Sequence, residues 1–136
     1  PDPDRCAVAA LYHDASEILT GDLPTPIKYY NPEIKTAYKQ VERVAGERLL
    51  NMLPPELRAS YEHDVLEDDE ALAPIVKGAD KLSAHIKCLE EQKAGNTEFD
   101  TAARQTWEAI QAMDRPELNW FVEHCLGAFA LNLDQL

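Results

Sequence analysis

The sequence is poor in glycine and cysteine, and it has no long hydrophobic run. Its 136 residues include 5 glycines and 3 cysteines. No apolar stretch approaches the roughly 20 residues that a membrane-spanning helix needs, and no signal-peptide pattern is present. Cys6, Cys88 and Cys125 lie far apart and in no CxxC spacing. We therefore expect reduced thiols, no membrane association and a cytoplasmic location.

Basic side chains are also scarce. The 13 lysines and arginines face 25 aspartates and glutamates, which gives a formal net charge of −12. Such a charge argues against nucleic acid as a partner, because binding to a phosphate backbone requires clustered lysine and arginine. It leaves room for a small phosphorylated substrate, provided that a metal ion and a few local cations offset the charge.

No stretch has the alternating pattern of a β-strand, whereas helix signals recur along the chain. Asp2-Pro3-Asp4 is a helix start, and the helix that follows is expected to reach about Leu19 and to bury Ala10, Leu11 and Ile18. Further helices are expected from 31–33 to 54, over 56–61, from about 69 to 94, after a capping box at Thr97 and Asp100, and from 114–116 to 129. The sequence predicts one all-α domain, residues 1–136, of about five or six helices.

Three ionisable side chains stand close together in the first expected helix. His13 and Glu17 are four residues apart and share a face, and Asp14 sits about 100° round the helix. Packing an imidazole and two carboxylates so closely costs desolvation and repulsion unless a cation joins them. A divalent first-row metal suits this mixture of ligands.

Spacing alone leaves two interpretations of this pattern open. A solvated or salt-bridged helix face explains it about as well as a metal site does. Asp80 is the best further carboxylate, because it stands beside the apolar stripe of the long expected helix, although pairing with Lys77 or Lys81 is the simpler explanation. A second His-Asp dipeptide, His63-Asp64, lies in an acidic stretch. We expect it to be solvent-exposed and to occur by chance, without a metal-binding role.

Two segments resemble the bacterial 5′-deoxynucleotidase branch of the HD-domain metal-dependent phosphohydrolases: YHDASEILTGDLPTPIKYYNP and KGADKLSAHIKCLEEQKAGNTEF. They match in order and separation, and the resemblance extends along essentially all of the chain. It implies an all-helical HD-domain bundle around a metal held by His13, Asp14 and Asp80. It also implies that the metal is cobalt, or manganese or another divalent transition metal, and that the protein is a homodimer.

The resemblance further implies an activity, the hydrolysis of deoxyribonucleoside 5′-monophosphates to deoxyribonucleoside and phosphate. Glu17 and Asp22 correspond to the carboxylates that lie at the substrate phosphate and the attacking water in this family. Lys28, which follows the PTP loop, is a weaker candidate for a substrate contact. The alternatives are an HD phosphohydrolase for another nucleotide and a catalytically silent helical interaction module.

The sequence departs from the family pattern near its start. The family's first histidine ligand lies on a helix well before the His-Asp pair, and an arginine-tryptophan pair that contacts substrate lies earlier still. Only twelve residues precede His13. We therefore expect that the chain lacks the N-terminal helices of the family. Neither His85 nor His124 is a strong replacement for the missing ligand.

Overall fold

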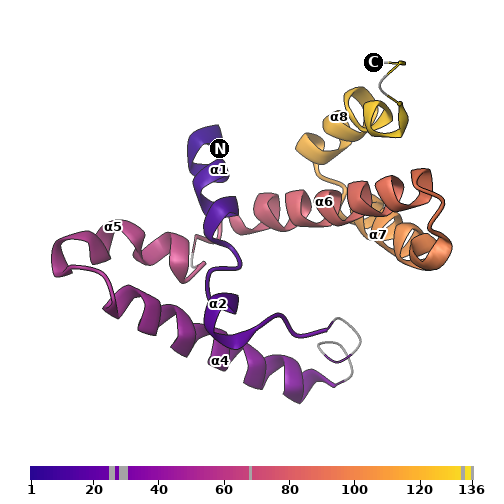
Figure 1. The fold of residues 1–136 in the computed structure, drawn as a ribbon. Coiled ribbons are helices and arrows are strands. Elements are labelled where there is room, and N and C mark those ends of the chain that lie inside the picture. The colour runs from indigo at the N-terminus through magenta and orange to yellow at the C-terminus, as the bar shows by residue number, and fades with distance from the viewer. Residues whose placement is uncertain (25–26, 28–30, 68, 133, 136) are drawn as a thin grey trace. The chain divides into compact units, whose positions relative to one another are not determined.

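The structure is a computed structural model that describes residues 1–24, 27, 31–67, 69–132 and 134–135 (Figure 1). No strand occurs among these residues, so the predicted all-α class is confirmed. The chain forms two compact units, Pro1–Ala73 and Pro74–Leu136, and each is described by itself. The elements are α1 (Pro3–Tyr12), α2 (Glu17–Thr20), α4 (Pro32–Asn51), α5 (Pro55–Val65), α6 (Ala73–Lys93), η1 (Thr97–Phe99), α7 (Asp100–Met113), α8 (Pro116–His124) and η2 (Leu126–Ala130).

The first helix begins as the sequence predicts but ends earlier. The Asp2 carboxylate accepts a hydrogen bond from the Asp4 amide at 2.9 Å, and Pro3 occupies the first helical position. The prediction that this helix reaches Leu19 is wrong, because α1 ends at Tyr12.

Tight turns replace α-helical bonding after Tyr12. The Ala15 amide donates to the Tyr12 carbonyl and the Glu17 amide to the Asp14 carbonyl, both at 2.9 Å. These are i to i+3 bonds, which wind the backbone more tightly than an α-helix. One further turn of α-helix, α2, then follows.

The expected burial of Leu11 and Ile18 is also wrong, since these side chains are 80% and 76% exposed. The face of α1 that meets α5 carries Tyr12, and Leu11 points about 100° away from it. Ile18 lies on α2, a helix of a single turn. Such a short helix does not bury every one of its side chains. Ala10 is half-buried.

Helices α4 and α5 pack against each other in the first unit. The Asn31 side chain caps α4 by accepting a hydrogen bond from the Ile34 amide at 3.2 Å, as its sequence predicts. Gly46 lets the helices approach closely, because a Cβ there would lie 3.0 Å from Leu66 Cδ2 and 3.3 Å from the Val65 carbonyl oxygen. Helix α5 continues to Val65, beyond the expected 56–61, so part of the supposed acidic connector is helical.

The core of the second unit is a small cluster from three helices. Leu82 of α6, Ile110 of α7 and Leu118 of α8 are buried against one another. Half-buried apolar side chains, Phe121 and Val122 among them, surround this cluster. Periodicity predicts that the apolar residues of the last helix, from Leu118 to Phe129, face inward. This is confirmed for Leu118, Phe121 and Val122, whereas α8 stops at His124 and Phe129, in η2, is 38% exposed.

The end of α6 is a glycine-based cap. Gly95 has a φ of 84°, and the next amide, of Asn96, donates back to the Glu91 carbonyl at 2.9 Å. The Asn96 side chain then accepts from the Glu98 amide at 3.1 Å and so caps η1. The capping box expected at Thr97 is wrong, because Asn96 provides the cap.

The state of the cysteines agrees with the prediction made for it. All three cysteines are free thiols, and Cys88 is buried. In the parts of the chain that the structure describes, no helix combines the length and the apolarity that crossing a bilayer requires.

Replacing Ile110 with alanine tests the core assignment. Ile110 is only 1% exposed, so Ile110→Ala should remove buried contacts, leave a cavity and lower the free energy of unfolding by about 2–5 kcal/mol. Urea denaturation followed by circular dichroism measures this change. The control is Gln111→Ala on the exposed side of α7, with an expected change within about 0.5 kcal/mol. Equal losses in both variants would contradict the assignment.

Candidate active site

His13 and Asp14 converge directly after the end of α1. The His13 Nε2 atom lies 3.1 Å from Asp14 Oδ2. Two donors bound to one transition-metal ion at about 2.1 Å, at about a right angle, are about 3 Å apart. The spacing and the chemistry of this nitrogen and oxygen therefore fit a shared divalent metal ion.

The backbone of α1 fixes the tautomer of the His13 ring. His13 Nδ1 lies 2.7 Å from the carbonyl oxygen of Ala10. A carbonyl only accepts hydrogen bonds, so Nδ1 carries the proton and donates it. In the neutral ring this leaves the lone pair on Nε2, the atom that faces Asp14, as a metal ligand requires.

Glu17 and Asp22 flank α2, which follows the His-Asp pair. Glu17 is the first residue of α2 and is half-buried, and its amide is bonded to the Asp14 carbonyl. Asp22 is exposed at the start of the loop after α2. Between them Gly21 ends the helix with a φ of 70°, a conformation that glycine adopts without strain, and donates to the Glu17 carbonyl at 2.9 Å.

Tyr38 of α4 ties down the segment that leads to Asp22. Its hydroxyl donates to the carbonyl oxygen of Gly21 and also lies 3.3 Å from Thr20 Oγ1. The helical periodicity of the sequence places Tyr38 among the apolar positions of α4 and does not indicate this hydrogen bond. Its polar role was hidden because the partner, a backbone carbonyl, has no signature in sequence.

The other predicted site residues belong to other segments of the chain. Asp80 belongs to α6 in the second unit, is 44% exposed and has Lys81 Nζ at 3.7 Å. Lys28 falls outside the described residues. Within the described ranges, no three histidine, cysteine, aspartate or glutamate side chains gather into a metal-binding group. The assignment of His13, Asp14 and Asp80 as joint ligands therefore stays a prediction.

The remaining histidines have local roles. His85 is buried, with Nδ1 at 3.1 Å from Thr106 Oγ1 and its ring against Trp107. His124 stacks on Trp120, with ring centroids 4.6 Å apart. Each ring thus has a local partner, in the core for His85 and on the exposed side of α8 for His124.

The second His-Asp dipeptide differs from its prediction. His63 is exposed, but Asp64 is only 5% exposed and forms an ion pair with Arg5, Nη2 to Oδ1, at 3.0 Å. The prediction that this dipeptide is solvent-exposed is therefore wrong for Asp64. Its burial depends on a partner 59 residues away, and no local pattern indicates such a contact.

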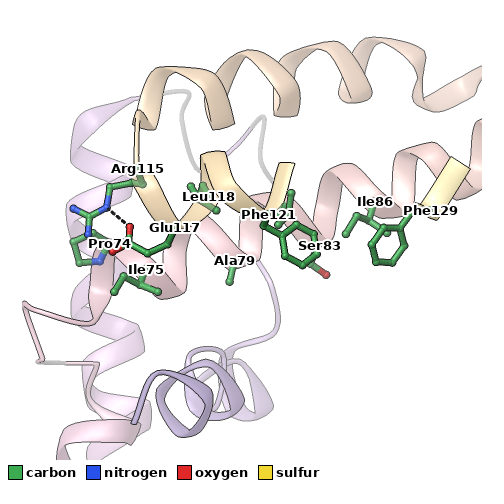
Figure 2. Close-up of a pocket in the computed structure, with 11 residues that line it drawn as sticks. Pro74, Ile75, Ala79, Ser83, Ile86, Arg115, Glu117, Leu118, Phe121 and Phe129 are labelled. Carbon is green, nitrogen blue, oxygen red and sulfur yellow. Dashed lines mark ion pairs between the residues drawn. The ribbon is translucent and has the colours of Figure 1, made fainter. Parts of the chain in front are cut away.

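A cavity of about 510 Å³ lies in the second unit, between α6 and the segment formed by α8 and η2 (Figure 2). Its walls are mainly apolar, with Leu82, Leu118 and Phe121 among them. At one end Arg115 Nε lies 3.6 Å from Glu117 Oε2. The residues that line it include none of the described candidates for catalysis or metal binding.

The chain belongs to the YfbR-like 5′-deoxynucleotidase family, whose model matches residues 1–129. The family resemblance found in the sequence is thereby confirmed.

Individual relatives match nearly the whole chain. It is 47% identical to a 5′-deoxynucleotidase of Erwinia tasmaniensis over 98% of the chain and 69% of that relative. It is 44% identical to a 5′-deoxynucleotidase of Shewanella oneidensis, over 99% of the chain and 70% of the relative. It is 45% identical to a 5′-deoxynucleotidase of Vibrio parahaemolyticus, over 98% of the chain and 70% of the relative.

The Tyr38 contact can be tested by removing one oxygen atom. Tyr38→Phe loses the hydrogen bond to the Gly21 carbonyl, so the free energy of unfolding should fall by about 1 kcal/mol. Amide hydrogen exchange at residues 20–22 should also become faster. Urea denaturation and exchange measured by NMR check both effects.

Tyr61→Phe is the matched control, because it keeps the ring contact with Tyr12 and should change stability by less than about 0.5 kcal/mol. Unchanged exchange at residues 20–22 in Tyr38→Phe would rule out the anchoring role of this tyrosine.

Proposed function

We propose that the protein is a metal-dependent 5′-deoxynucleotidase. It hydrolyses deoxyribonucleoside 5′-monophosphates to the deoxyribonucleoside and phosphate. Family membership and the names of the relatives support this activity. The observation that carries the metal requirement is the convergence of His13 Nε2 and Asp14 Oδ2 at 3.1 Å, with the opposite ring nitrogen held by the Ala10 carbonyl.

His13, Asp14 and Asp80 would hold the metal ion. One imidazole and two carboxylates are suitable ligands for Co²⁺, which we propose as the ion, with Mn²⁺ as the alternative. When bound, the ion supplies Lewis acidity that polarises a phosphoryl oxygen and makes water a better nucleophile. A positive ion is also what a phosphate dianion needs in a chain whose net charge is −12.

Glu17 and Asp22 are the proposed catalytic carboxylates. In the hydrolysis, water adds to phosphorus, the bond from phosphorus to the 5′ oxygen breaks, and one proton of the water ends on that leaving oxygen. Glu17 would orient the water and accept its proton, and Asp22 would contact the substrate or its leaving oxygen. Tyr38 supports this role of Asp22 by fixing the preceding carbonyl. Lys28 is a further, weaker candidate for a contact to the phosphate.

The proposal extends to the state of the protein. We infer a homodimer in the cytoplasm. The free cysteines support a reducing compartment, and the family resemblance supports the dimer.

The carboxylate of Glu17 should be essential for turnover. Wild-type protein should release phosphate from dAMP or dTMP when Co²⁺ or Mn²⁺ is added, and excess EDTA should stop the reaction. Glu17→Gln keeps the shape but cannot accept a proton, so kcat should fall by about 100-fold or more. A colorimetric phosphate assay measures this change, and thermal unfolding should show the fold intact.

Glu47→Gln is the control, since Glu47 is exposed and paired with Arg43 on α4. Turnover in EDTA equal to turnover in metal would refute the proposal. Hydrolysis of other nucleotides in preference to the deoxyribonucleoside monophosphates would indicate a different HD phosphohydrolase, and the absence of both metal and turnover would indicate a silent interaction module.

Asp80 should be needed for metal retention. Asp80→Asn removes one anionic ligand, so the Co²⁺ content after equilibrium dialysis should fall by about tenfold at subsaturating metal. Asp100→Asn, at the start of α7, is the control and should keep the wild-type content. Inductively coupled plasma mass spectrometry gives the metal-to-protein ratio. Equal retention by the two variants would remove Asp80 from the ligand set.

A further inference from the structure

Helix α1 is fastened to α5 at two points of one face. The Arg5 guanidinium donates to both oxygens of Asp64, from Nη2 to Oδ1 at 3.0 Å and from Nη1 to Oδ2 at 3.4 Å. About two turns further along α1, on the same face, the Tyr12 ring meets the Tyr61 ring edge-on, with centroids 5.8 Å apart. One contact thus holds the start of α1 and the other its last residue.

Asp64 is unfavourably placed for its own helix. It is only 5% exposed, so its charge loses most of its hydration. It also lies in the last turn of α5, where the helix dipole disfavours an anion. The two-pronged bond from Arg5 offsets both penalties, because a guanidinium matches a carboxylate in charge and in geometry. The role of Asp64 is therefore to fix α1.

The position of α1 determines how the His13–Asp14 pair is presented. Tyr12, the last residue of α1, immediately precedes this pair. The Ala10 carbonyl, which accepts from His13 Nδ1 at 2.7 Å and so orients the ring, belongs to the final turn of the same helix. A tilt or slide of α1 on α5 would move the ring and the Asp14 carboxylate together.

We propose that Arg5 and Asp64 are positioning residues for the His13–Asp14 metal-binding pair. This inference rests on the proposed function only in that the pair holds a metal ion. Neither residue contacts the pair directly; they act through the placement of α1. Outer partners that orient metal ligands commonly change metal affinity by 10–100-fold, about the range expected here.

The test is the Co²⁺ affinity of Asp64→Asn. This substitution keeps the shape of the side chain but removes the charge that holds Arg5, so the dissociation constant should rise by about tenfold. The visible absorption of bound Co²⁺ should change as well, because ligand geometry is altered. Calorimetric titration and absorption spectra, both recorded well below the unfolding temperature, measure these effects without any turnover.

Two matched variants separate positioning from general stability. Glu47→Gln makes the same kind of change in the exposed Arg43–Glu47 pair of the same unit and should bind Co²⁺ like wild type. Leu50→Ala removes a buried side chain of α4 and should lower Tm while keeping the affinity. A loss of affinity in Leu50→Ala as large as that in Asp64→Asn would overturn the inference.

Arg5→Lys keeps the positive charge but cannot form the two parallel hydrogen bonds to Asp64. It tests the inference if Asp64→Asn does not fold. If Arg5→Lys binds Co²⁺ more weakly than wild type at an unchanged Tm, the positioning role is supported. If its Co²⁺ affinity and absorption spectrum equal those of wild type, the inference is overturned. Failure of the proposed function is visible separately, in wild-type protein that releases no phosphate from dAMP with Co²⁺. Failure of this inference is visible in an active wild type whose Asp64→Asn variant binds Co²⁺ unchanged.

Discussion

The ion pair between Arg5 and the buried Asp64 holds the start of α1 against α5 in the first unit. Removing one partner of a buried pair destabilises a protein by about 3–5 kcal/mol, because the other charge is left without hydration or a counter-charge. Arg5 is 43% exposed, and water screens its charge, so this pair contributes less than a fully buried one. About one kcal/mol is nevertheless a notable part of the stability of a domain, so this ion pair and the Tyr12–Tyr61 contact together hold α1 on α5.

The Asp14 carboxylate, like that of Asp64, lies beside a nitrogen-containing side chain, but its neighbour is a histidine and not an arginine. Asp64 has a cation supplied by the chain itself, in a fork that uses both carboxylate oxygens. Asp14 faces His13 Nε2, and the other ring nitrogen donates to the Ala10 carbonyl, so the ring in its neutral form turns a lone pair toward Asp14. A carboxylate and a lone pair turned toward one point are complementary to an external cation. The contrast explains why one His-Asp dipeptide is structural and the other is the candidate metal site.

Local patterns in the sequence predict much of the fold. Features that depend on contacts between distant residues are not predicted. The all-α class and the caps at Asp2 and Asn31 follow from periodicity and from side chains that bond to nearby amides. The extension of α5 to Val65 was missed because its last turn contains Asp64, whose burial is favourable only with Arg5 in place. A contact that spans 59 residues leaves no periodic trace in the sequence.

The candidate site was predicted in its residue types but not in its backbone. A continuous helix would direct His13 and Asp14 about 100° apart, whereas the structure ends α1 at Tyr12 and follows it with tighter turns. Propensity does not indicate this stop, because neither proline nor glycine occurs between Tyr12 and Glu17. The two side chains converge at 3.1 Å where the regular helix is interrupted. A rigid α1, fixed by Arg5, and an irregular segment directly after it therefore have complementary roles: the first sets where the pair lies, and the second lets its donor atoms meet.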